Sequence, residues 1–287
     1  MMGPVTDHAA AMTAQLAAAG RAVESRRPDR LFDDPLAAAL AGEKGFRWLE
    51  RWRLPGMPEE NPIIGPRTRF FDDLVVAAVS EGARQVVLVA AGMDTRAFRL
   101  NLPAHTVAYE LDQPVVLADK QQVLDREHAT PTCRRVPVEV DLGEGAWPSA
   151  LVTSGFDPFA FTVFIAEGLS AYLTKEDNAR LLDQLAALAP LGGTFGIDML
   201  SEDYLDNPAV RPFLDRLRSL GIPWQFGTND PANFFAAHGW QAQVHDFDVI
   251  GRQLGRWPPP GLSEEVAARA AERSRSFFIR AKRASRA

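Results

Sequence analysis

The chain has 287 residues and a formal net charge of −6 at pH 7. Its hydrophobic share of 46% and charged share of 24% are typical of a globular protein, at a length that suits one large α/β domain with an insertion or a cap. The acidic balance argues against a nucleic-acid-binding surface, which needs clustered Lys and Arg. No apolar run approaches the length of about 18 residues that crosses a membrane. With no export signal and a single cysteine, Cys133, we expect a soluble, cytoplasmic protein that has no intramolecular disulfide.

The first part of the chain, residues 1–65, is predicted to be a helical region that covers a ligand. A stretch containing Pro and Gly, residues 54–66, separates this region from the predicted main domain, residues 66–287. Within that domain, residues from about 200 to 226 fit neither a strand nor a core helix well. They contain several aromatic side chains, so we expect an insertion there that forms another part of a cap over the substrate.

From residue 85 onward, short apolar runs alternate with helical stretches, which predicts a parallel sheet covered on both faces. Seven strands are predicted, at residues 85–91, 106–110, 134–140, 159–166, 194–198, 240–246 and 276–281. Helices are predicted at residues 115–127, 175–189 and 229–238, the second of them with Thr174 as its N-cap. Little helix is expected between the last two strands, so a hairpin would allow the final strand to run antiparallel. The fold class is therefore α/β, doubly wound and Rossmann-like, with a mostly parallel sheet.

The first two predicted strands end in residues that suit a ligand, and the ends of parallel strands meet at one edge of a sheet. The first strand runs into Ala-Ala-Gly at residues 90–92, where small side chains let a ligand approach the backbone, although the same residues also suit a tight turn. The second strand ends in Glu110-Leu111-Asp112. Either carboxylate could accept hydrogen bonds from ribose hydroxyls, and Asp112 could instead cap the helix that begins near Pro114.

The next two strands end in a similar way. Asp141 could accept from an adenine amino group while Leu142 lies on the ring, although a solvated loop aspartate is an alternative. Glu167 follows a buried strand, where a carboxylate is costly unless it has partners, and this favours a role in the site. The turn after Gly92 has no Gly-x-Gly-x-x-Gly cradle for a pyrophosphate, so a cofactor without phosphates fits better than NAD.

Together these motifs resemble the leucine carboxyl methyltransferase-like family, including its bacterial members. The matching segments lie in the family's order between about residues 31 and 200: Leu-Phe-Asp-Asp-Pro at 31–35, Arg-Thr-Arg-Phe-Phe-Asp-Asp at 67–73, Ala-Gly-Met-Asp-Thr-Arg at 91–96, Arg-Leu at 99–100, Glu-Leu-Asp-Gln-Pro at 110–114, Asp-Leu at 141–142, and Glu-Gly-Leu at 167–169, which leads to Tyr-Leu at 172–173. The resemblance implies the class I methyltransferase fold, in which the last strand is antiparallel, and S-adenosylmethionine as the cofactor.

The resemblance also implies a role for each matching residue. Arg67 would hold the methionine carboxylate of the cofactor, because its guanidinium is a fork of donors. The other implied contacts are Gly92 under the methionine part, Asp112 on the ribose hydroxyls, Asp141 and Leu142 on adenine, and Glu167 on the methionine amino group or in the pocket wall. The family usually has glycine where this chain has Ala90, which puts a methyl group near the cofactor.

The predicted function is O-methylation of a carboxylate on a small molecule or peptide. A carboxylate is already ionised at pH 7 and needs no general base, whereas a hydroxyl acceptor would need one. No residue is assigned to catalysis. Tyr172 and His245 are candidates for the substrate pocket, and no histidine lies in a metal-ligand spacing, so no metal is expected. The alternatives are a hydroxyl O-methyltransferase of natural-product biosynthesis, a nicotinamide-dependent oxidoreductase and a catalytically silent S-adenosylmethionine-binding regulator. The sequence leaves the acceptor and the oligomeric state open.

Overall fold

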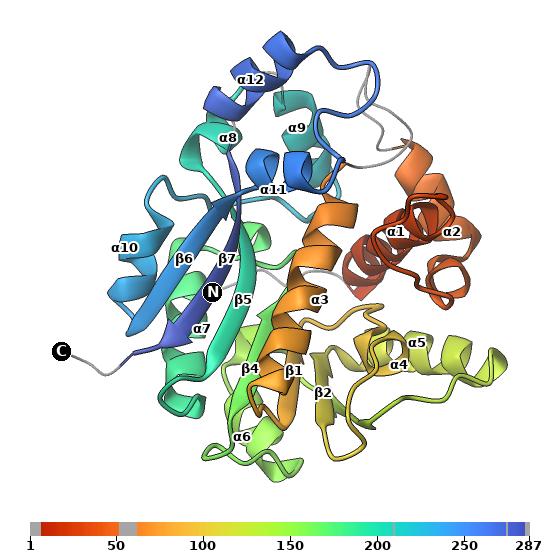
Figure 1. Ribbon diagram of the computed structural model, residues 1–287, viewed down its shortest axis with the longest axis vertical. Coiled ribbons are helices and arrows are strands. Elements are labelled where there is room, and N and C mark those ends of the chain that lie inside the picture. The colour runs from red at the N-terminus through yellow and green to blue at the C-terminus, as the bar shows by residue number, and fades with distance from the viewer. Residues whose placement is uncertain (1–6, 52–61, 209, 274, 285–287) are drawn as a thin grey trace.

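The sheet has the predicted seven strands. The computed structural model describes residues 7–51, 62–208, 210–273 and 275–284, and within them the strands form one sheet in the order β3-β2-β1-β4-β5-β7-β6 (Figure 1). Their bounds are β1 Gln85–Val89, β2 Val107–Asp112, β3 Arg134–Glu139, β4 Thr162–Ala166, β5 Thr194–Leu200, β6 Trp240–Asp246 and β7 Ser276–Arg283. Strands β1 to β5 pair in parallel, and β7 runs antiparallel to both β5 and β6. The doubly wound sheet with an antiparallel last strand is confirmed.

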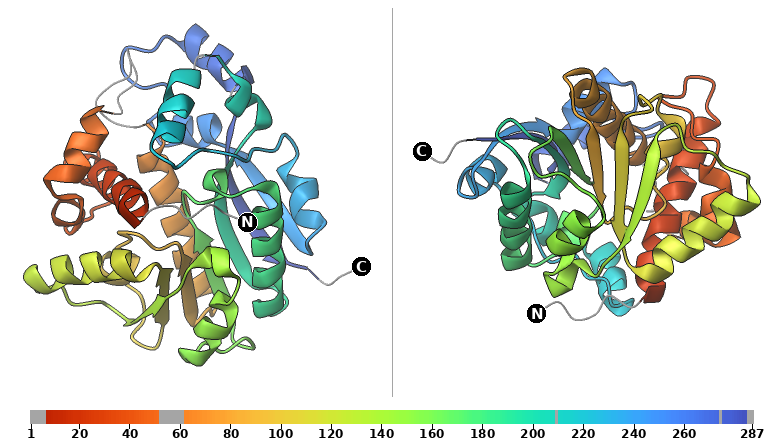
Figure 2. Two further views of the ribbon diagram at one scale, coloured as in Figure 1. Left: turned by 180° about the vertical axis from the view of Figure 1, so that it is seen from behind. Right: turned by 90° about the horizontal axis from the view of Figure 1, so that it is seen from below.

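Helices cover both faces of this sheet (Figure 2). The α-helices of the described residues are α1 Asp7–Ser25, α2 Ala37–Arg51, α3 Ile64–Ser80, α4 Arg96–Arg99, α5 Pro114–Arg126, α6 Trp147–Thr153, α7 Lys175–Leu188, α8 Glu202–Asp206, α9 Arg211–Ser219, α10 Pro231–Ala236, α11 Phe247–Gln253 and α12 Glu264–Arg273. Helices α3, α4 and α5 lie on one face, and α6, α7 and α10 lie on the other. Every residue of β1 and β4 is buried, which explains their continuous apolar runs.

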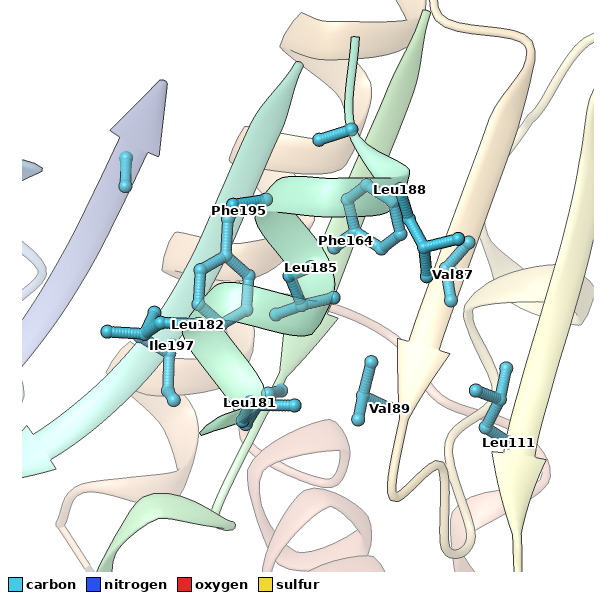
Figure 3. Packing of buried hydrophobic residues seen from close by; sticks show 14 of the residues in the cluster. Val87, Val89, Leu111, Phe164, Leu181, Leu182, Leu185, Leu188, Phe195 and Ile197 are labelled. Atoms are coloured by element: carbon cyan, nitrogen blue, oxygen red, sulfur yellow. The ribbon is translucent and has the colours of Figure 1, made fainter. Parts of the chain in front are cut away.

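Helix α7 shows how the sequence fixes one of these layers. Thr174 caps the helix as predicted, because its side chain accepts a hydrogen bond from the backbone N–H of Asp177. Leu181 and Leu185 project from one face of the helix onto the sheet, where they meet Phe164 and Phe195 (Figure 3). Burial of one leucine side chain stabilises a fold by about 1.5–3 kcal/mol, so this face holds α7 on the strands.

The connection between the last two strands differs from the prediction. Helices α11 and α12 lie between β6 and β7, so the two strands do not form a hairpin. Strand β7 lies between β5 and β6 and runs antiparallel to both, and adjacent antiparallel strands allow a short connection without requiring one. The Ala- and Glu-rich sequence of α12 is itself a strong helix former, so the signal was present in the chain.

The N-terminal helices and the insertion meet in one apolar cluster. Met12 of α1 and Trp48 of α2 pack with Leu214 and Leu217 of α9. Trp224 also packs against this cluster. The insertion expected at about 200–226 holds α8 and α9 in its described residues, after β5 ends at Leu200. Helix α3 begins before the predicted domain division at 65/66, and residues 52–61 of the separating stretch lie outside the described residues. No helix among the described residues has the length and apolarity needed to span a bilayer.

Candidate cofactor and active site

The turn after β1 has a left-handed backbone conformation and lies in close contact with α1. Ala90 and Gly92 both have positive φ, at 55° and 49°. This left-handed conformation costs a residue with a side chain roughly 1–2 kcal/mol, which accounts for the glycine that the family usually has where this chain has Ala90. A Cβ added to Gly92 would lie 3.1 Å from the Cβ of Ala14, so α1 packs directly on the turn.

Asp112 joins the ends of the first two strands. Its Oδ2 accepts a hydrogen bond from the backbone N–H of Gly92 at 2.6 Å, and its Oδ1 accepts from the N–H of Gln113 at 2.8 Å. The N-cap position of α5 belongs to Gln113, so Asp112 does not serve as the helix cap that was its alternative role. Burial raises the pKa of Asp112, and the N–H groups of Gly92 and Gln113 act against that rise.

Glu110, the other carboxylate considered for the ribose, lies in a different environment. Its side chain is completely buried beneath α5, where Oε2 is 2.8 Å from the Nζ of Lys120 and 2.8 Å from Nη2 of Arg135. Two residues farther along the strand, Asp112 is only partly buried. The structure therefore brings Asp112, and not Glu110, to the edge where the strand ends meet.

Arg67 binds two carboxylates at the edge of the sheet where the parallel strands end. It projects from α3, and its Nε donates to Oε1 of Glu167 at 3.0 Å while Nη1 donates to Oδ2 of Asp198 at 3.2 Å. Glu167 follows β4, and Asp198 lies on the neighbouring strand β5. Burial acts to raise the pKa of Glu167, but the guanidiniums of Arg96 and Arg67 outweigh it and lower that pKa. Burial raises the pKa of Asp198.

Arg96 extends these ion pairs into a larger ion network. It lies beneath the turn that follows β1 and contains Gly92, called the glycine turn below. It is 1% exposed, and it donates to Glu167 at 2.7 Å and to Asp72 of α3 at 2.8 Å. It also pairs with Asp94 in the turn, and although burial acts to raise the pKa of Asp94, the charges of Arg96 and Lys120 lower it to about 2. The three carboxylates come from α3, the turn and the end of β4, so Arg96 fixes these segments relative to one another.

The same network reaches the N-terminal helices. Asp34, which follows α1, accepts from Nε of Arg21 at 2.8 Å and from the hydroxyl of Thr95 at 2.7 Å. Arg21 also donates to the backbone carbonyl of Met93. Arg99 lies between the contacts of Arg96 and those of Asp34, since it pairs with Asp72 and lies 3.8 Å from Asp34. Helix α1 is thus connected to the glycine turn by buried polar contacts as well as by packing.

The predicted adenine residues lie after β3, at a distance from the ion network along the sheet edge. Asp141 is exposed and caps a short 3-10 helix, Leu142–Glu144, because its Oδ1 accepts from the N–H of Gly143 at 2.8 Å. Leu142 lines a small cavity of about 20 Å³ together with Leu169 and Leu173. A cavity of this size holds about one water molecule, and Asp141 is not among its lining residues, so the adenine contacts of Asp141 and Leu142 remain a prediction.

The two candidates for the substrate pocket are placed differently. Tyr172 lies near Arg67 and contacts Trp224 edge-to-face at 6.2 Å, and burial raises its pKa. His245 lies at the end of β6, with its ring 5.3 Å from that of Phe70, and burial lowers its pKa. His245 has no contact with the ion network among the described residues. In the part of the chain that the structure describes, no group of three or more His, Cys, Asp or Glu side chains could hold a metal ion.

Sequence reasoning missed Asp198. A signal was available, because Asp198 follows four apolar or small residues of a buried strand, as Glu167 follows β4. The contact that makes Asp198 part of the site, its pairing with Arg67, joins residues 131 positions apart and leaves no local pattern.

Comparisons with known proteins show the family to which the chain belongs. The family model of the leucine carboxyl methyltransferases matches residues 14–186. A Mycobacterium marinum protein, named as a candidate S-adenosyl-L-methionine-dependent methyltransferase, is 36% identical over 264 residues, which cover 86% of this chain and 88% of that protein. A Streptomyces coelicolor protein with the same description is 37% identical over 265 residues, which cover 86% of this chain and 91% of that protein.

The fold has a counterpart among solved structures. A DUF574 family protein from Streptomyces avermitilis aligns with a TM-score of 0.61 at 15% identity, over 94% of this chain and 97% of its own. At that identity the likeness supports the fold alone. The family model spans more than half of the sequence, and the chain therefore belongs to the leucine carboxyl methyltransferase family of S-adenosylmethionine-dependent methyltransferases.

Proposed function

We propose that this methyltransferase transfers the methyl group of S-adenosylmethionine to a carboxylate of a small molecule or peptide. The cofactor part of this proposal rests on the buried ion network at the strand ends. It contains five carboxylates and four guanidiniums, so it has an excess of one negative charge: Asp34, Asp72, Asp94, Glu167 and Asp198 against Arg21, Arg67, Arg96 and Arg99. S-adenosylmethionine carries one net positive charge and complements that excess.

The site residues fit the parts of this cofactor. Arg67 offers its guanidinium to the methionine carboxylate, and Glu167, kept ionised by two arginines, suits the ammonium group. Asp112 lies beside the glycine turn, where it would accept from the ribose hydroxyls. Leu142 and Asp141 would hold the adenine ring and its amino group. The positive φ of Gly92 lets the turn bend close to the cofactor, while its missing side chain makes room for Ala14 of α1.

The carboxylate part of the proposal rests on two tyrosines of the apolar cluster, Tyr172 and Tyr204, which favour a substrate that needs no deprotonation. When bound, S-adenosylmethionine supplies an electrophilic methyl group on its sulfonium. Burial raises the pKa of Tyr204 to about 12 and also raises that of Tyr172, so both phenols stay protonated at neutral pH and can donate hydrogen bonds to a carboxylate. Tyr204 and Trp224 belong to the apolar cluster of the cap. A cap of this kind excludes water and aligns the acceptor, and orientation supplies much of the rate of such a displacement.

The family description also supports a carboxylate acceptor. The test is methyl transfer from labelled S-adenosylmethionine to two matched sets of compounds, small carboxylic acids and peptides in one set and phenols and alcohols in the other. We expect transfer to the first set, with a product that mild base hydrolyses as it does any methyl ester. A base-stable ether formed from the second set would contradict the carboxylate assignment. Absence of turnover with S-adenosylmethionine bound would point to a silent binding protein.

A further inference from the structure

Asp198 holds two neighbours of the cofactor site at once. Its Oδ1 accepts from the backbone N–H of Gly168 at 2.6 Å, and its Oδ2 accepts from Nη1 of Arg67 at 3.2 Å. The side chain is 15% exposed, so both bonds form in a largely water-excluded place. A Cβ added to Gly168 would lie 3.4 Å from Nη1 of Arg67, so the guanidinium lies against the turn that follows β4.

Arg67, Glu167 and Arg96 form a chain in which each neighbouring pair is joined by a single hydrogen bond. Nε of Arg67 bonds to Oε1 of Glu167, and Oε2 of Glu167 bonds to Nη2 of Arg96. Arg67 and Glu167 are therefore not joined in the two-bond pair that an arginine and a carboxylate prefer. Among the described residues, Nη2 of Arg67 takes part in no hydrogen bond, and so this nitrogen is open to a ligand.

We propose that Asp198 is a positioning residue that holds Arg67 for the methionine carboxylate of the cofactor. By binding Nη1 from the side of β5, Asp198 keeps Arg67 from closing onto Glu167 with two bonds. Nη2 of Arg67 then stays available for the cofactor carboxylate, and Glu167 stays available for the ammonium. This inference rests on the proposed role of Arg67 in binding the cofactor.

Asp198→Asn separates this role from a purely structural one. The amide oxygen of Asn can still accept from the N–H of Gly168, so the turn keeps its support. The amide nitrogen is a donor and faces Nη1 of Arg67, also a donor, so the bond that positions Arg67 is lost. A matched control is Asp183→Asn on α7, where an exposed carboxylate pairs with His238 at the surface.

The experiment measures the affinity of two ligands by calorimetry. S-adenosylhomocysteine carries the amino-acid part, and 5′-methylthioadenosine is a related nucleoside thioether without it. We expect Asp198→Asn to weaken S-adenosylhomocysteine binding by about 10-fold and to leave methylthioadenosine binding unchanged. In an Arg67→Ala background, Asp198→Asn should cause no further loss. Asp183→Asn should bind both ligands as the wild type does.

Three outcomes would overturn the inference. Normal binding of S-adenosylhomocysteine by Asp198→Asn would show that Arg67 does not need Asp198. An equal loss for both ligands would show that Asp198 supports the fold of the site only. A further loss in the Arg67→Ala background would show that Asp198 acts without Arg67. By contrast, wild-type protein that binds neither ligand would reject the proposed function itself, whatever the variants do.

Discussion

At the scale of single residues, the site depends on carboxylates whose partners are backbone N–H groups or guanidiniums. Asp112 bonds to two N–H groups, and Glu167 bonds to two arginines. A carboxylate with such partners is oriented before a ligand arrives, so little conformational entropy is lost when the ligand binds. The same partners leave each carboxylate with lone pairs for a further hydrogen bond.

The first prediction concerns Asp112. Asp112→Ala should weaken binding of S-adenosylmethionine by about 1.5–3 kcal/mol, the range for hydrogen bonds to a charged group. Asp112→Asn should lose less affinity for S-adenosylmethionine, because its amide oxygen can still accept hydrogen bonds from the N–H of Gly92 and from one ribose hydroxyl. Calorimetry gives the affinities, and thermal unfolding without ligand serves as the control. An Asp112→Ala variant that unfolds much earlier yet binds the cofactor normally would show a structural role alone.

At the scale of elements, the contact of α1 with the glycine turn is the one that links the cap to the site. Ala14 packs on Gly92, and Arg21 and Asp34 bond to the turn and to the start of α4. These contacts join the first helix of the chain to residues about 70 positions later, as the separation of 72 between Arg21 and Met93 shows. The cap is therefore held against the site by charged groups that have little access to water.

A second prediction tests this connection. Asp34→Ala should destabilise the protein by about 3–5 kcal/mol, because the substitution leaves the buried charge of Arg21 without its carboxylate partner. Asp33→Ala is the matched control, since Asp33 is exposed and lies 4.0 Å from its partner Arg30. The control should change stability by less than about 0.5 kcal/mol. Urea unfolding measures both, and equal effects of the two substitutions would contradict the connection.

At the scale of the whole molecule, the cap and the sheet together decide which groups can titrate during turnover. The pKa of His245 is lowered from 6.5 by burial, so this imidazole is neutral from pH 7 upward. The pKa of Tyr204 is raised to about 12, so this phenol stays protonated. Neither group changes its charge in the neutral range, and a carboxylate acceptor is ionised throughout that range.

The third prediction follows from these pKa shifts of His245 and Tyr204. The rate of methyl transfer at saturating substrates should stay nearly flat from about pH 7 to 9, because neither the acceptor nor the groups around it change charge there. Steady-state kinetics over that range measures the profile, with His245→Ala as the control that should behave as the wild type does. A rise in rate between about pH 5 and 7 that His245→Ala abolishes would indicate a histidine base and a hydroxyl acceptor instead.

Features that depend on neighbours along the chain could be predicted from the sequence. Continuous apolar runs marked β1 and β4, Thr174 marked the start of α7, and the strand ends indicated one edge for the site because parallel strands all end on the same side. The family motifs then indicated the cofactor. These signals are local, since each arises from residues within a few positions of one another.

Which side chains meet depends on how distant segments pack, and local patterns in the sequence did not predict it. Glu110 and Asp112 look alike in sequence, and the distinction between them comes from the position of α5, whose Lys120 encloses one carboxylate and not the other. The pairing of Arg67 with Asp198, and the return of β7 between β5 and β6, likewise join segments far apart in the chain. Whether a buried charge has a partner depends on distance and burial in three dimensions, and the spacing of residues along the chain determines neither.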